Sequence, residues 1–198
     1  MSGRYMAYVG SYSYTGKAKG ITVFDVDVEK GTFKERCEME VNNSSYVIAS
    51  SDGKTLYSIA DEGVVSFRIL QNGALARLNS APIRGMRGCH LCSDLEDKFI
   101  FVSGYHDGKT TILSLNKDGS VGGIVDGVYD KGYGSVAERN FRPHVTCTRR
   151  MPDNKYILSV DNGVDQVKIY RFNDKEQKMV QVDAIRCDLE SAPRHFRF

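Results

Sequence analysis

The chain has 198 residues, of which 41% are hydrophobic and 26% are charged, and its 27 Lys and Arg nearly balance its 25 Asp and Glu. This composition is typical of a globular protein. The net charge is only +2 and the basic residues are scattered, so we expect no nucleic-acid partner. No apolar run reaches the roughly 18 residues of a membrane span, and no cleavable leader is visible. We therefore expect a cytoplasmic protein with no membrane partner, whose five cysteines are free thiols.

Four short apolar runs recur along the chain and predict buried strands, at residues 5–12, 55–61, 99–105 and 156–161. Each run is followed, after a turn that contains glycine, by an alternating run that predicts a hairpin partner. These partners are residues 21–26, 64–69, 110–115 and 166–172. A third strand follows another turn, and a fourth precedes the next apolar run. The chain is therefore predicted to be all-β, in units of four antiparallel strands.

The spacing of these units predicts propeller blades. Tyr8, Tyr57, Phe101 and Leu158 occupy equivalent positions, at intervals of 49, 44 and 57 residues. A repeat of roughly 40–50 residues with four antiparallel strands is typical of a β-propeller. The longest interval contains a glycine-rich insert at residues 122–134, which we expect to be a loop at the channel rim. A β-sandwich is the alternative, but it does not explain why whole units repeat in phase.

Sixteen strands, or about four blades' worth, fit residues 5–198. The first unit lacks its first strand and begins at its second. Residues 193–198 resemble the first strand of a fifth unit. We expect one partial propeller domain over residues 1–198. It could close as a four-bladed ring, remain an open arc or pair with a second copy. Unpaired sheet edges favour self-association.

Several short motifs occur in a set order along the chain. They are Tyr8-Val-Gly-Ser-Tyr12, Asn43-Ser-Ser-Tyr46, Gly88-Cys-His-Leu91, Tyr105 with Gly108, Pro143-His144, Asp161-Asn-Gly-Val-Asp165 and Ala192-Pro-Arg-His195. With these motifs the chain resembles the lactonase family of seven-bladed β-propellers, which includes bacterial 6-phosphogluconolactonase and is similar to carboxymuconate-lactonizing enzyme. Seven blades need roughly 300 residues or more, so we expect this to be the N-terminal portion. The resemblance places a further catalytic Glu in the later blades.

Histidines fall on or near the predicted first strands of three units, and first strands line the channel of a propeller. Imidazole can accept a proton near neutral pH, and a guanidinium can bind a carboxylate, phosphate or oxyanion. By resemblance, His144 is the candidate base or proton donor and Arg194 the candidate electrophilic or anion-binding group. His90 and His195 are expected to support substrate binding. Spacing alone adds Arg142, two residues before His144, to the anion site.

Each candidate also has a structural interpretation. His144 could simply bind a backbone carbonyl, and Arg194 could be an ion-pair partner. His106 is expected to be a turn residue. Asp161 and Asp165 are expected to accept backbone N–H groups of the turn between them.

The segment Cys89-His-Leu-Cys92 has a spacing that suggests zinc, but alternate residues of a strand point to opposite sides, so we expect neither a metal nor a cofactor. No nucleophile elbow is present, which favours direct attack by water. The leading hypothesis is hydrolysis of a sugar-acid lactone, of the type that 6-phosphogluconolactonase cleaves, with assistance from His and Arg. The expected partner is a small lactone or a phosphorylated sugar acid. We expect the chain alone to be weakly active or inactive. The alternatives are a non-catalytic propeller that binds a partner or anionic ligand, and a carboxymuconate cycloisomerase.

Overall fold

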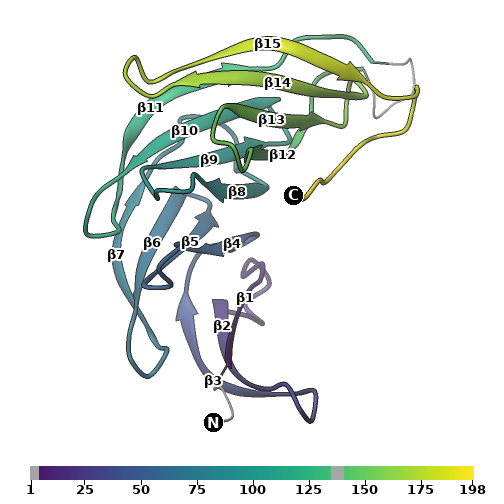
Figure 1. The fold of residues 1–198 in the computed structure, drawn as a ribbon. Helices are drawn as coiled ribbons and strands as arrows, with labels where there is room; N and C mark the ends of the chain where they lie inside the picture. Colours follow the sequence, from purple (N-terminus) through teal and green to yellow (C-terminus); the bar gives the residue numbers. More distant parts are fainter. Residues whose placement is uncertain (1–4, 135–140) are drawn as a thin grey trace.

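The computed structural model describes residues 5–134 and 141–198, and these contain fifteen strands and no helix. Four antiparallel sheets follow one another along the chain and fan out as an open arc (Figure 1). The prediction of propeller blades is therefore confirmed, and the sandwich alternative is wrong. The first and last sheets form the two ends of the arc, so the ring of four blades does not close.

The strands of each sheet are consecutive in the chain. The first sheet has three strands: β1 (Tyr5–Gly10), β2 (Gly20–Asp27) and β3 (Thr32–Glu40). The others have four each: β4 (Val47–Ala49), β5 (Thr55–Ala60), β6 (Gly63–Ile69) and β7 (Leu75–Ala81); β8 (His90–Ser93), β9 (Phe99–Gly104), β10 (Lys109–Leu115) and β11 (Val121–Tyr129); β12 (Val145–Arg150), β13 (Tyr156–Asp161), β14 (Gln166–Asn173) and β15 (Lys178–Arg186). As expected, the first sheet begins at its second strand.

Three apolar layers hold the four sheets together, one between each neighbouring pair. Ile21, Val23 and Phe67 are buried between the first and second sheets. The layer between the second and third contains Tyr57, Ile59, Leu91, Ile100 and Leu113, and the layer between the third and fourth contains Phe101, Ile112, Ile157, Tyr170 and Phe172. A central strand such as β5 is buried along its whole length, because a neighbouring sheet covers each of its faces.

The short first strands β4, β8 and β12 lie on the inner side of the arc (Figure 1), and β8 contacts both of the others. The long last strands lie on its outer side. Residues on the inner strands, although distant in sequence, therefore face one channel.

Two expectations about local structure are wrong. Residues 193–198 form no strand, because no second strand of their own sheet is present to pair with them in the described part of the chain. Instead they run beside β12. The glycine-rich insert is not a loop over most of its length, because residues 121–129 form β11 and pair with β10. Residues 135–140 lie outside the described residues. Among those described, no helix could cross a membrane.

Candidate functional site

A turn between β13 and β14 fixes the backbone of His144, which immediately precedes β12. The amide of His144 donates to Oδ1 of Asp161 at 2.8 Å, and the amide of Gly163 donates to the same oxygen at 3.0 Å. A Cβ atom at Gly163 would lie 1.9 Å from the carbonyl oxygen of Arg142, so only glycine allows this approach. Asp161 therefore has the expected turn role, and it also positions the histidine.

The His144 ring is held on one face and at one edge by Tyr105. The two rings stack at 4.4 Å with an interplanar angle of 15°, and Nδ1 of His144 lies 2.6 Å from the carbonyl oxygen of Tyr105. A carbonyl oxygen only accepts hydrogen bonds, so Nδ1 carries the proton and Nε2 presents a lone pair when the ring is neutral. Within the described residues, Nε2 has no hydrogen-bond partner.

A buried charge network lies behind this turn. Nζ of Lys168 lies 3.3 Å from Oδ2 of Asp161 and 3.2 Å from Oδ2 of Asp130, and all three side chains are inaccessible to solvent. The hydroxyl of Tyr170 donates to Oδ1 of Asp130 at 2.5 Å. Burial raises the pKa of Asp130 to about 6, although the Lys168 charge opposes the rise. Through Lys168, strand β14 is linked both to Asp130, the residue after β11, and to Asp161 of the turn that holds His144.

The segment that carries Arg194 is fixed beside β12. Asp165 accepts the amides of Glu190 and Ala192, each at 2.8 Å, instead of amides of its own turn. Farther along, Oγ1 of Thr146 donates to the carbonyl oxygen of Arg194 at 2.8 Å. Arg194 is therefore brought to the same end of β12 as His144. Its side chain is exposed and has no carboxylate partner among residues 5–134 and 141–198.

The rings of His90 and His195 lie close together beside β12. Their ring centroids are 6.3 Å apart, and Nε2 of His90 lies 3.6 Å from Sγ of Cys147. His90 is buried, and its Nδ1 has no hydrogen-bond partner in the described part of the chain. Burial, with the charges of Arg149 and His195, lowers the pKa of His90 to about 3. His90 is therefore neutral near pH 7 and cannot exchange protons there.

Arg142 and His106 make no contact with the His144 ring among the described residues. The guanidinium of Arg142 is exposed and lies over the ring of Phe141 at 5.5 Å, and no described contact joins it to His144. His106 is exposed in the turn after β9, where its ring meets the edge of Tyr105.

The five cysteines are free thiols. Cys89 donates to the carbonyl oxygen of Val145 and Cys92 to that of Ser93, so the two thiols have different partners. No group of three His, Cys, Asp or Glu side chains suited to a metal ion occurs in residues 5–134 and 141–198.

Arg149 is a channel residue that the sequence analysis did not identify. Burial raises the pKa of Tyr46, and the Arg149 guanidinium opposes this rise through its charge and a side-chain hydrogen bond. Arg149 interacts with Cys147 in the same way. These contacts place a guanidinium at the layer of His90. The sequence alone contains no signal for this position, because it does not show which of Arg149 and Arg150 faces the channel.

Comparisons with known proteins agree with this architecture. Residues 6–198 match the family described as lactonase, 7-bladed beta-propeller. The chain belongs to this lactonase family. It is similar to 6-phosphogluconolactonase from Bacillus subtilis, with 30% identity over 98% of this chain and 56% of the relative. Among solved structures, it is similar to a candidate 6-phosphogluconolactonase from Bacteroides fragilis, with a TM-score of 0.88 and 32% identity over 97% of this chain and 57% of that one.

A third comparison concerns the fold alone. A periplasmic gluconolactonase from Pseudomonas aeruginosa has a TM-score of 0.88 at 22% identity, over 97% of this chain and 57% of that chain. This lactonase-family chain thus spans a little over half the length of the proteins it matches.

Proposed function

We propose that the protein hydrolyses a sugar-acid lactone of the 6-phosphogluconolactone type. The names of the relatives from Bacillus subtilis and Bacteroides fragilis support this substrate class, since both are about one-third identical to this chain over nearly its whole length. The contacts around His144 support the reaction type.

In the proposed reaction, Nε2 of His144 takes a proton from water as the water oxygen attacks the lactone carbonyl carbon. The carbonyl oxygen becomes an oxyanion, and the Arg194 guanidinium stabilises its negative charge. Collapse of this intermediate breaks the bond to the ring oxygen, which receives the proton from Nε2. The product is the open hydroxy acid, and the imidazole returns to its starting state.

The hydrogen bond from Nδ1 of His144 to the carbonyl oxygen of Tyr105 is the observation that carries this proposal. It selects the tautomer in which Nε2 can act as a base, and it stabilises the imidazolium that forms during the reaction. The expected structural role of His144, binding a backbone carbonyl, is thus compatible with catalysis. His90 and His195 are proposed to line the channel wall without transferring protons.

Hydrolysis of 6-phosphogluconolactone by the complete protein tests the proposal, measured as acid release above the spontaneous rate. We expect Arg194→Gln to lower kcat by about a hundredfold to a thousandfold, because one oxyanion contact is lost. Arg186→Gln, a change at an exposed position on β15, is the matched control. A wild-type rate equal to the spontaneous rate would refute the proposal. Turnover of a carboxymuconate substrate instead would assign the site to cycloisomerisation.

A further inference from the structure

The ammonium group of Lys168, on β14, is buried behind the turn that holds His144. The side chain is 1% exposed. Its Nζ donates to the carbonyl oxygen of Lys131 at 2.8 Å and to Oδ2 of Asp161 at 3.3 Å. Oδ2 of Asp130 lies 3.2 Å from Nζ as a second ion-pair partner, outside hydrogen-bond geometry. The ammonium is thus surrounded by oxygen atoms of the protein, so it does not bind substrate itself.

Asp161 connects this ammonium to the proposed base. Its two carboxylate oxygens have different partners. Oδ2 accepts from Lys168, whereas Oδ1 accepts the backbone amides of His144 at 2.8 Å and of Gly163 at 3.0 Å. A hydrogen bond to a charged acceptor is roughly twice as strong as one to a neutral acceptor. The buried ammonium stabilises the negative carboxylate that these two amides require, because a buried carboxylate without a cation is strongly disfavoured.

Lys168 also contacts both ends of the connection between β11 and β12. Asp130 and Lys131 begin this connection directly after β11, and His144 ends it directly before β12. The backbone of Asp130 is itself held, because its amide donates to the carbonyl oxygen of Gly108 at 2.8 Å. One ammonium group is therefore linked to the point where the connection leaves the third sheet and to the point where it reaches the proposed base.

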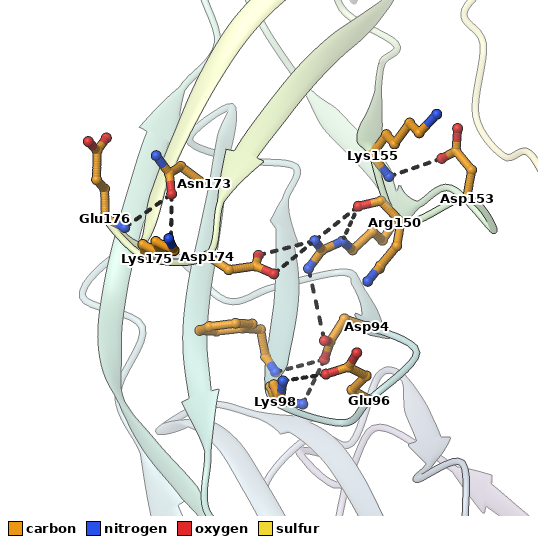
Figure 2. A network of polar contacts seen from close by, with 12 residues as sticks. Asp94, Glu96, Lys98, Arg150, Asp153, Lys155, Asn173, Asp174, Lys175 and Glu176 are labelled. Carbon is orange, nitrogen blue, oxygen red and sulfur yellow. Dashed lines mark hydrogen bonds and ion pairs between the residues drawn. The ribbon is translucent and has the colours of Figure 1, made fainter.

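A second buried cation on the same sheet provides a comparison. Arg150 is the last residue of β12, at the far end of this strand from His144, and its side chain is 5% exposed. Its guanidinium lies 3.1 Å from Asp174 and 3.9 Å from Asp94, and it donates to the carbonyl oxygen of Asn154 at 3.0 Å (Figure 2). Like the buried lysine, it has two carboxylates and a backbone carbonyl as partners. Among residues 5–134 and 141–198, no hydrogen bond or ion pair joins these partners to the proposed base.

We propose that Lys168 is a positioning residue for the hydrolysis, which acts through the carboxylate of Asp161 to hold the backbone of His144. This inference rests on the proposed function. It assigns a role in turnover to a side chain that touches neither substrate nor channel. Loss of this side chain should affect kcat rather than KM, because the base is displaced while the groups that bind the substrate remain.

The test compares Lys168→Met with Arg150→Met in the complete protein. Each variant removes one buried cation that has two carboxylate partners, so both should lower the free energy of unfolding. We expect Lys168→Met to lower kcat for 6-phosphogluconolactone by about tenfold to a hundredfold, with KM changed by less than about threefold. Arg150→Met should keep kcat within about twofold of the wild-type value, because it shares no partner with the base. Equal losses of kcat, or no loss in either variant, would overturn the assignment.

A second variant covers the case in which Lys168→Met does not fold. Combining it with Asp130→Asn removes one of the two carboxylates that are left without a cation, and leaves the other, Asp161, to accept the amide of His144. The same fall in kcat is expected of this double variant. A folded double variant with wild-type kcat would overturn the assignment.

Amide hydrogen exchange separates this inference from the proposed function, because it needs no turnover. Relative to the amides of the buried strand β5, we expect the amides of His144 and Gly163 to exchange at least about tenfold faster in Lys168→Met than in wild type. Their exchange should be unchanged in Arg150→Met. Unchanged exchange in Lys168→Met would overturn the inference, whatever the protein hydrolyses. Faster exchange in a protein that hydrolyses no lactone would support the link from Lys168 to His144 and refute the proposed function.

Discussion

Tyr105 holds His144 in two ways, since its ring stacks on the imidazole at 4.4 Å and its carbonyl oxygen binds Nδ1 at 2.6 Å. One contact fixes the plane of the imidazole, and the other fixes which nitrogen carries the proton. The hydrogen bond that the backbone amide of His144 donates to Oδ1 of Asp161 fixes the backbone of the same histidine. The proposed base is therefore ordered from three directions by residues of two neighbouring blades.

Replacing the Tyr105 ring should weaken catalysis without abolishing it. Tyr105→Leu removes the stacked ring but keeps the backbone carbonyl, so we expect kcat to fall by about twofold to tenfold with little change in KM. Steady-state kinetics on the lactone measures this effect. Tyr133→Leu changes a tyrosine that is 94% exposed and serves as the control. An unchanged kcat in Tyr105→Leu would mean that the stacked ring does not order the base.

Removing the Asp165 carboxylate should release the segment that carries Arg194. Asp165→Ala leaves the amides of Glu190 and Ala192 without their acceptor, and we expect a loss of about 1–3 kcal/mol in unfolding free energy together with a lower kcat. Denaturant unfolding and lactone kinetics measure the two effects. Asp183→Ala, at an exposed position on β15, is the control. A stable variant with full activity would show that Asp165 does not position Arg194.

Neutralising Asp130 should change how stability depends on pH. Its folded pKa of about 6 lies above its unfolded value of 3.8, so the folded state binds more protons in this range and loses stability as the pH rises through it. Asp130→Asn lacks this penalty. We expect the variant to gain about 1–3 kcal/mol relative to wild type between pH 4 and pH 7. Thermal unfolding between pH 4 and pH 7 measures the difference in stability between the variant and wild type, with the exposed change Asp153→Asn as the control. A stability difference that does not vary with pH would contradict the account of a buried charge.

Replacing His90 should change the pH dependence of stability in the opposite direction to replacing Asp130. Its folded pKa of about 3 lies below its unfolded value of 6.5, so the folded state binds fewer protons and stability is lost as the pH falls below 6.5. His90→Gln should therefore become more stable relative to wild type as the pH is lowered from 7 to about 4. The pH dependence of kcat between 6 and 8 should not change. A shifted kinetic profile would assign His90 a role in proton transfer.

The strand pattern was predictable because alternation and turn residues are local signals. The predicted runs at 55–61, 99–105 and 156–161 differ from β5, β9 and β13 by at most one residue. Residues 193–198 were predicted incorrectly because a strand also needs a pairing partner, which the local sequence does not encode. The glycines of residues 121–129 suggested a loop, but pairing with β10 outweighs their low strand propensity.

The site was predictable only in part. The resemblance pointed to His144 and Arg194, and the structure brings both to one end of β12. The spacing argument for Arg142 assumed an extended strand, whereas β12 begins only at Val145, so alternation does not relate Arg142 to His144. Arg149 was missed because the sequence does not show which member of the Arg149-Arg150 pair finds a carboxylate partner. That depends on Asp94 and Asp174, which lie on other turns.

The most direct test of the account is the kcat of His144→Ala in the complete protein. The substrate is 6-phosphogluconolactone, the spontaneous rate of hydrolysis is subtracted, and His106→Ala is the control variant. We predict a loss of about a hundredfold to ten-thousandfold for His144→Ala, because a general base is removed. His106→Ala removes only an edge contact with the Tyr105 ring and should keep at least about half of the wild-type turnover. Equal rates in the two variants would contradict the assignment of His144 as the base.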